Sequence, residues 1–347
     1  MVSSQILGMK NQARIIAQKQ PCCEPLSWQQ QLQEAVTDLA TLAELVSLPI
    51  EQLSAEAHQQ FPIMVPRSFI NKMQAGNPND PLLQQVLPST KELTSPENFS
   101  SDPLQETGLN QPKGLLQKYQ SRALLVLAGK CAINCRYCFR RHFPYQDNRI
   151  SSDDWQNILD FLKADTQINE VIFSGGEPLL VSDSKLARYI ANLEQIPQLK
   201  RIRIHTRLPI TIAQRLTDTL LTALTNTRLK TIMVLHSNHP NEIDQTLANA
   251  VAVFRQAGVH FLNQSVLLKG INDDVSTLTQ LSEALFDAHI LPYYLHQLDR
   301  VEGAAHFAVN EAQAIALHQQ LQVNLPGFLV PKLVRELPDQ PHKTLLF

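Results

Sequence analysis

The sequence predicts an α/β fold, a partial (β/α)6 barrel that follows an N-terminal helical region and precedes a short C-terminal tail. From Arg122 onward, short β-rich runs alternate with stretches of helical length and spacing. This alternation indicates a parallel sheet with right-handed crossovers. Polar residues or glycines follow nearly every run, and this is where chemistry collects in β/α folds.

Residues 1–118 are expected to form a mostly helical N-terminal region. Ser27 is a suitable N-cap for the first helix, which shows helical spacing of apolar residues. The stretch 77–113 is rich in Pro, Asn, Ser, Asp and Gly, which favours irregular connections. The helices of this region are expected at 28–48, 54–60 and 66–74.

The barrel is predicted over residues 119–324 as six strands, each followed by a helix. Six units fall short of the eight that close a full barrel. Residues 325–347 contain four prolines and form the tail, with a strand candidate at 328–334. The barrel strands are expected at 123–127, 170–173, 201–205, 231–236, 260–267 and 292–297. The helices are expected at 153–163, 183–194, 212–224, 242–257, 276–288 and 310–322.

Composition excludes several classes of protein. The chain has 347 residues, of which 44% are hydrophobic and 18% charged, so a mostly disordered chain is excluded. A formal charge of −2 excludes a globally basic nucleic-acid binder, although a local basic patch stays open. No apolar run approaches the roughly 18–20 residues that span a bilayer, and no secretory signal is evident. We therefore expect a cytoplasmic protein that does not bind membranes or nucleic acid.

Three of the five cysteines, Cys131, Cys135 and Cys138, follow the first barrel strand with the spacing C-x3-C-x2-C. This clustering favours a thiolate-bound metal in a reducing compartment over a disulfide framework. Three thiolates can bind three irons of a cubane cluster and leave the fourth open to an outside ligand. Zinc bound by the same cysteines and His142 is the alternative. The spacing, with Tyr137 beside the last cysteine, favours the iron–sulfur cluster, whereas Cys22 and Cys23 receive no role.

This cysteine pattern resembles the radical S-adenosylmethionine (SAM) superfamily. A second signature of that superfamily, Gly-Gly-Glu-Pro after the second strand, is matched by SGGEP at 174–178. The resemblance implies a [4Fe–4S] cluster whose open iron chelates the amino and carboxylate groups of SAM. It also implies that His236 and Gln264, at the ends of the fourth and fifth strands, contact the adenosine part. The expected contacts to the methionine part are Ser174, Gly175, Gly176 and Glu177, with Glu177 at the ammonium.

Further stretches resemble the lysine 2,3-aminomutases, in one register from about residue 119 to residue 343. The short tail is most similar to the branch that makes (R)-β-lysine for modifying elongation factor P. This family uses pyridoxal phosphate, and the resemblance implies that Lys343 forms the Schiff base and that Lys118 and Arg122 bind the phosphate. The usual glycine-rich stretch before this lysine is absent here. The matching stretches are 118–122, 138–142, 203–207, 236–242, 263–273 and 292–307.

The same resemblance predicts the substrate. Arg140 would bind the α-carboxylate, because a guanidinium suits a carboxylate. Asp299 and Glu336 would hold the distal ammonium, and Glu336 stands where the family usually has aspartate. Two converging carboxylates repel unless a cation lies between them, which favours lysine as the substrate. Surface salt bridges with the neighbouring Arg300 or Arg335 are the structural alternative for these two acids.

The sequence therefore predicts a lysine 2,3-aminomutase that converts L-α-lysine to β-lysine with a 5′-deoxyadenosyl radical and pyridoxal phosphate aldimine chemistry. Its expected partners are free lysine, an electron donor such as a flavodoxin or ferredoxin, and the ligase that modifies elongation factor P. A homo-oligomer is a further expectation. Two alternatives stay open, namely a radical aminomutase for another amino acid and a non-catalytic binding protein held together by its metal.

Overall fold

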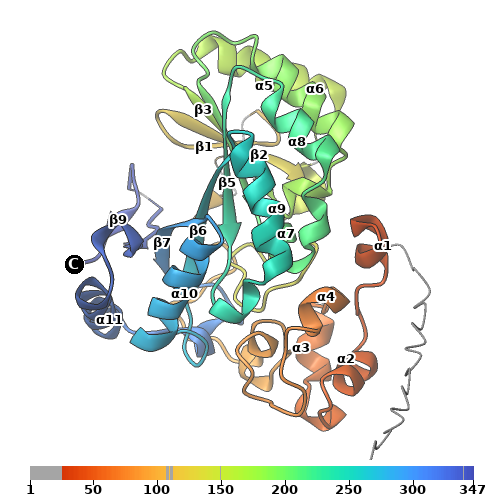
Figure 1. Cartoon of the computed structure of the whole chain (residues 1–347), viewed down its shortest axis with the longest axis vertical. Coiled ribbons are helices and arrows are strands. Elements are labelled where there is room, and N and C mark those ends of the chain that lie inside the picture. Colours follow the sequence, from red (N-terminus) through yellow and green to blue (C-terminus); the bar gives the residue numbers. More distant parts are fainter. Residues whose placement is uncertain (1–25, 107–108, 110–111, 149, 339) are drawn as a thin grey trace, which may run out of the picture.

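The computed structural model describes residues 26–106, 109, 112–148, 150–338 and 340–347, so Cys22 and Cys23 lie outside the described residues (Figure 1). The strands are β1 (Leu115–Tyr119), β2 (Arg122–Ala128), β3 (Glu170–Gly175), β4 (Arg201–Thr206), β5 (Lys230–His236), β6 (His260–Leu267), β7 (Leu291–Gln297), β8 (Lys332–Arg335) and β9 (Thr344–Leu345). The helices are α1 (Trp28–Gln33), α2 (Leu39–Leu45), α3 (Ala55–Gln60), α4 (Arg67–Ile70), α5 (Ser152–Ala164), α6 (Asp183–Leu193), α7 (Leu208–Thr211), α8 (Asp218–Thr225), α9 (Gln245–Gln256), α10 (Val275–Asp287) and α11 (Glu311–Asn324).

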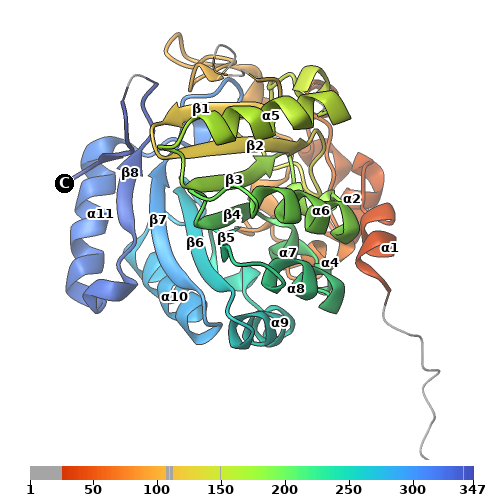
Figure 2. The ribbon, with the colours of Figure 1, turned by 90° about the horizontal axis from the view of Figure 1, so that it is seen from above.

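The strands form one sheet in the order β1 to β9, so each strand pairs with its neighbours in sequence. Strands β2 to β8 are parallel, and β1 and β9 pair antiparallel at the two ends. Figure 2 shows this sheet curving into an arc with helices on its outer side. The predicted partial barrel is confirmed. The parallel part has one strand more than the six predicted, because the tail strand β8 joins it beside β7.

Alternating side chains on the strands build both faces of the wall. In β4, Ile202 and Ile204 are buried and belong to the main hydrophobic core, together with buried residues of α5, α6 and α8. The intervening Arg203 and His205 line a cavity inside the arc. Since side chains alternate along a strand, the apolar set packs on the helices and the polar set faces inward. The inner face of the wall is therefore available for chemistry.

The predicted barrel helices are confirmed within a few residues, with one exception. The segment expected at 212–224 has a short 3-10 helix at Ala213–Arg215 and becomes α-helical only at Asp218, where the Thr217 side chain accepts a hydrogen bond from the Leu220 backbone N–H. α5 shows why the others form. Ser151 and Asp154 make a reciprocal capping box, and the helix buries Trp155 and Ile158 on one face.

The single helix predicted at 28–48 is wrong, because the chain breaks between α1 and α2. Val36 pairs with Val65 through backbone hydrogen bonds of 2.8 and 2.9 Å, and Asp38 then caps α2. The helix predicted at 54–60 is confirmed as α3, whereas the one predicted at 66–74 shortens to α4. Figure 1 shows these helices gathered at one side of the barrel. Their apolar cluster includes Ile133 of the cysteine loop, so this region packs against that loop.

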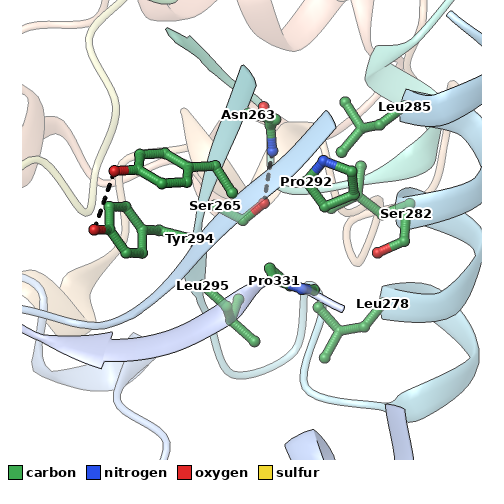
Figure 3. Close-up of a pocket in the computed structure, with 11 residues that line it drawn as sticks. Asn263, Ser265, Leu278, Ser282, Leu285, Pro292, Tyr294, Leu295 and Pro331 are labelled. Carbon is green, nitrogen blue, oxygen red and sulfur yellow. Dashed lines mark hydrogen bonds between the residues drawn. The ribbon is translucent and has the colours of Figure 1, made fainter. Parts of the chain in front are cut away.

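The wall itself is tightly packed where β6 and β7 meet α10. A gap of about 10 Å³ lies between Asn263, Ser265 and Leu278, and Asn263 donates a hydrogen bond of 2.9 Å to Ser265 (Figure 3). Such a volume holds one water molecule at most. Among the described residues, no helix is long and apolar enough to cross a membrane.

Candidate active site

A cavity of about 820 Å³ occupies the inside of the arc. It extends from the cysteine loop and the carboxyl ends of the strands to Arg122 and Glu170 at the strand starts. Its size is that of a small-molecule site. The structure brings all the candidate residues of the sequence together on its lining, namely Lys118, Arg122, Cys131, Cys135, Cys138, Arg140, Ser174, Gly175, Gly176, Glu177, His236, Gln264, Asp299, Glu336 and Lys343.

Cys131, Cys135 and Cys138 are free thiols on the loop after β2. Burial and then the nearby Cys135 raise the pKa of Cys138 to about 11, and burial with Cys138 and Cys135 raises the pKa of Cys131. The three sulfurs therefore lie close enough to influence one another. Among the described residues, no three His, Cys, Asp or Glu side chains are arranged around a single ion, and His142 is exposed outside the cavity. This donor set fits a cubane cluster with one open iron better than zinc.

The glycines of the 174–178 stretch hold the cysteine loop in place. A Cβ on Gly176 would lie 2.3 Å from the Lys130 carbonyl oxygen, so only glycine fits. The Gly176 N–H donates to the Ala128 carbonyl over 2.8 Å, and the Glu177 N–H donates to the Lys130 carbonyl over 2.8 Å. The loop therefore starts from a backbone clamp between β2 and β3.

The Glu177 carboxylate is buried and accepts four hydrogen bonds from its own chain. The donors are the Leu179, Arg207 and Leu208 N–H groups at 2.9–3.0 Å and the Thr206 hydroxyl at 2.6 Å. Burial raises its pKa, and these hydrogen bonds oppose that rise. The side chain thus fastens the end of β3 to the end of β4, and its role at the SAM ammonium stays a prediction.

Arg140 lies in the cavity, where its guanidinium is already engaged. Its Nε and Nη2 atoms donate to the two carboxylate oxygens of Glu106 over 2.7 and 2.6 Å, and Nη1 donates to the Ser174 hydroxyl over 3.2 Å. This is a bidentate pair of the kind that a substrate carboxylate would form. Glu106 therefore occupies the place that the sequence assigns to the substrate.

At the acidic end of the cavity, the side chains of three residues donate hydrogen bonds to Glu336. Its carboxylate accepts hydrogen bonds from Lys118 Nζ over 2.9 Å, from the Tyr119 hydroxyl and from Lys343 Nζ. Burial would raise the pKa of Glu336, but Lys343, Tyr119 and Lys118 lower it to about 2. Among the described residues, no side chain forms a hydrogen bond or ion pair with the Asp299 carboxylate. Burial raises its pKa to about 7, with Lys343 opposing and Glu336 adding to the rise.

Only one of the two cations predicted for the phosphate is free of ion pairs within the described chain. Lys118 is bound to Glu336 and also donates to the Leu337 carbonyl. Arg122 stacks over the Tyr119 ring at 3.9 Å and forms no ion pair with any described residue. Arg122 is therefore the better placed of the two to meet an anion.

Sequence reasoning missed several polar residues of the lining. Arg203 and His205 on β4 and His296 on β7 face inward, and the signal was the alternation of polar and apolar residues along the strands. The Nε2 atoms of His205, His236 and His296 are buried, and none of the residues that the structure describes forms a hydrogen bond with them. Burial lowers the pKa of all three, to about 3 for His236, so the rings are neutral. These orphaned atoms fit a cavity built to contact a bound group.

Comparison with known proteins agrees with this geometry. A family model described as the Radical SAM superfamily matches residues 125–281. The chain is 48% identical to L-lysine 2,3-aminomutase of Haemophilus influenzae over 96% of its length and 99% of that protein. It is 47% identical to L-lysine 2,3-aminomutase of Escherichia coli K12, with 96% and 98% covered. It is also 34% identical to the enzyme of that name in Acetoanaerobium sticklandii, over 80% and 67%.

Proposed function

This chain belongs to the lysine 2,3-aminomutase family of radical SAM enzymes, and from that premise we propose that it moves the α-amino group of L-lysine to the neighbouring carbon and releases β-lysine. Members of this family are isomerases, so the chain is an isomerase that uses radical SAM chemistry. The observation that carries the choice of substrate is the pair of carboxylates, Asp299 and Glu336, in one cavity with the three cysteines.

The family implies a [4Fe–4S] cluster, SAM and pyridoxal phosphate as cofactors. Cys131, Cys135 and Cys138 would hold the cluster, and Lys343 would hold pyridoxal phosphate with Arg122 near its phosphate. The orphaned histidine nitrogens and the inward-facing Arg203 support the fit of bound groups in the same cavity. When bound, these cofactors supply a carbon-centred radical and a π-system that stabilises the rearranging substrate.

The chain's own residues position the substrate by charge. The Lys343 ammonium lies against Glu336, and its charge also influences Asp299. A second ammonium, the distal group of lysine, would take that place once Lys343 holds the cofactor. Arg140 at the other end would bind the carboxylate after Glu106 leaves. A substrate with one carboxylate and a distal cation satisfies both ends, whereas a distal carboxylate would be repelled.

The barrel covers part of the site. The apolar core lies between the strands and the outer helices, and the cysteine loop packs against the N-terminal region. An enclosed site prevents side reactions of a reactive intermediate. We further propose that the product is (R)-β-lysine, passed to the ligase that modifies elongation factor P. A flavodoxin or ferredoxin would supply the electron.

The test is anaerobic incubation of the reconstituted protein with L-lysine, SAM and a reductant. We expect release of 5′-deoxyadenosine and an isomer of lysine that chiral chromatography with mass spectrometry identifies as (R)-β-lysine. Asp299→Asn is expected to impair lysine turnover at least tenfold, because it removes one of the two carboxylates proposed to bind the distal ammonium. The iron content is expected to stay unchanged, because the variant keeps the shape of the side chain and leaves the three cysteines in place. Glu302→Gln, an exposed acid three residues further on, is the matched control.

Two outcomes would contradict the proposal. Full clusters and deoxyadenosine release without any rearranged lysine would overturn the substrate. The (S) enantiomer as product would overturn the link to elongation factor P while leaving the aminomutase activity standing.

A further inference from the structure

Arg207 follows β4 directly and points its guanidinium at the cysteine loop. Its Nη1 atom donates a hydrogen bond of 2.7 Å to Cys135 Sγ, and the residue is buried at the edge of the cavity. Cys135 is one of the three proposed cluster ligands. The positively charged Arg207 guanidinium therefore donates a hydrogen bond to the sulfur of a proposed cluster ligand.

A buried network holds this guanidinium in position. Nη1 also donates to the Tyr137 hydroxyl, and Nη2 donates to Gln85 Oε1 over 2.6 Å and to Glu242 Oε2 over 3.1 Å. Glu242 is itself buried, and its other oxygen accepts hydrogen bonds from the Asn238 and His239 N–H groups. Since every partner is buried or internally bonded, the arginine cannot turn away from the sulfur without leaving unpaired polar groups.

Such a contact acts on electron transfer. A cluster gains one negative charge on reduction, and part of it lies on the cysteine sulfurs. A positively charged N–H donor at a sulfur stabilises the reduced form more than the oxidised form, which raises the reduction potential. The Glu242 carboxylate beside the guanidinium opposes this effect.

We propose that Arg207 is a positioning residue that raises the reduction potential of the iron–sulfur cluster through Cys135, with Glu242 moderating its charge. This inference rests on the proposed function, because it requires the cluster. It assigns to the network of Arg207, Glu242, Gln85 and Tyr137 a task distinct from binding substrate.

The experiment is a redox titration of the anaerobically reconstituted holoenzyme, followed by the electron paramagnetic resonance signal of the reduced cluster. Arg207→Gln is expected to lower the ratio of reduced to oxidised cluster about tenfold at the wild-type midpoint, which corresponds to about 59 mV for one electron. Arg207→Lys keeps the charge and is expected to recover part of this loss. Glu242→Gln removes the opposing charge, so the shift is expected in the other direction.

The matched control is Arg215→Gln. Arg215 is another fully buried arginine after β4, paired with Asp183 over 2.6 Å, and it has no contact with the cysteines among the described residues. We expect this variant to lose stability while its cluster keeps the wild-type midpoint. At the wild-type midpoint potential, both Arg207→Gln and Glu242→Gln could have a ratio of reduced to oxidised cluster within twofold of the wild-type ratio. With full iron content, that result would overturn the inference and leave the proposed function intact.

An equal decrease in Arg207→Gln, Glu242→Gln and Arg215→Gln would also overturn it, because general loosening would then explain the shift. If Arg207→Gln assembles no cluster, the direction of the Glu242→Gln shift decides: a rise supports the inference, and no rise overturns it. A wild-type protein that binds no cluster would overturn the inference and the proposed function together.

Discussion

At the scale of single residues, two carboxylates in one cavity have opposite ionisation behaviour. Glu336 accepts hydrogen bonds from three side chains and has a pKa of about 2. No described side chain pairs with the Asp299 carboxylate, and burial raises its pKa to about 7. Glu336 is therefore ionised at every physiological pH. Asp299 is the group whose charge changes with conditions, and a bound ammonium would favour its ionised form.

This difference predicts a pH dependence of lysine binding. A carboxylate is ionised above its pKa, so the distal ammonium should bind more tightly as pH rises through 7. Below that value, the KM for lysine should increase by up to about tenfold per pH unit. Steady-state measurements between pH 6 and 8 check this. Asp299→Asn should flatten the profile, and a profile that stays steep in that variant would contradict the assignment.

The Glu106–Arg140 pair gives a second prediction at this scale. Because Glu106 is bound to the Nε and Nη2 atoms of the guanidinium that is proposed to bind the substrate carboxylate, the two carboxylates compete. Glu106→Gln is expected to weaken this competition and to lower the KM for lysine about threefold to tenfold, which corresponds to the net contribution of one ordinary hydrogen bond, about 1 kcal/mol. Steady-state kinetics on the reconstituted enzyme measure it.

Glu97→Gln is the control, since Glu97 is an exposed acid of the same connecting segment. A higher KM in Glu106→Gln would show that Glu106 helps to orient Arg140 for the substrate, contrary to the prediction.

At the scale of elements, hydrophobic periodicity predicted the parallel strands and their helices because each buries a wide apolar face. It failed where a short polar signal decides the structure. The break between α1 and α2 depends on Asp38 as an N-cap and on the Val36–Val65 pairing, which joins distant residues. The end strands β1 and β9 were not predicted, because each is short and carries polar residues.

Those two missed strands determine where predicted site residues lie. Lys118 is on β1, and Lys343 directly precedes β9, which pairs with β8. A family resemblance can identify such a lysine by its place in the sequence. Only the tertiary fold shows that Lys118 meets Glu336, which lies 218 positions away in the sequence. The fold also reveals Glu106 as the partner of Arg140, 34 positions away, and Arg207 as the partner of Cys135.

The clamp between β2 and β3 gives a prediction at the same scale. Gly176→Ala places a methyl group against the Lys130 backbone, which cannot move aside as a flexible side chain could. Overpacking of this kind costs about 1–3 kcal/mol, so we expect a lower free energy of unfolding and loss of bound iron. Denaturant unfolding and iron analysis measure the two effects.

Gly327→Ala is the matched control, because a Cβ at Gly327 meets no atom within 4 Å. Normal iron content in Gly176→Ala would show that the cysteine loop tolerates displacement of this backbone, contrary to the prediction.

At the scale of the whole molecule, the N-terminal region and the barrel are joined at the cysteine loop. Glu92 of the N-terminal region is buried and pairs with Arg136 over 2.5 Å and with Arg141 over 3.0 Å. The Arg136 N–H also donates to the Gln85 carbonyl, and the Asn134 N–H donates to the Met64 carbonyl. The loop that would hold the cluster therefore has one side formed by a region outside the barrel.

This junction predicts that stability and cluster binding are linked. Glu92→Gln leaves the buried Arg136 and the largely covered Arg141 side chain without their counter-charge, and breaking a buried pair costs about 3–5 kcal/mol. We expect a loss of that size in the free energy of unfolding, together with reduced iron content. Glu97→Gln, which is exposed, should behave as wild type. A loss below about 1 kcal/mol would indicate that the two regions are held together elsewhere.

Among the described residues, β1 and β9 at the two ends of the sheet are not paired with each other. Hydrogen bonds from the Lys118 and Tyr119 side chains to Glu336, and from Lys118 to the Leu337 carbonyl, join β1 to the tail. Elsewhere the barrel wall can part only if a ladder of backbone hydrogen bonds ruptures. Along this line the described contacts are side-chain hydrogen bonds to Glu336 and to the Leu337 carbonyl. The carboxylate that joins the two ends of the sheet is therefore the same one that is proposed to bind the distal ammonium of the substrate.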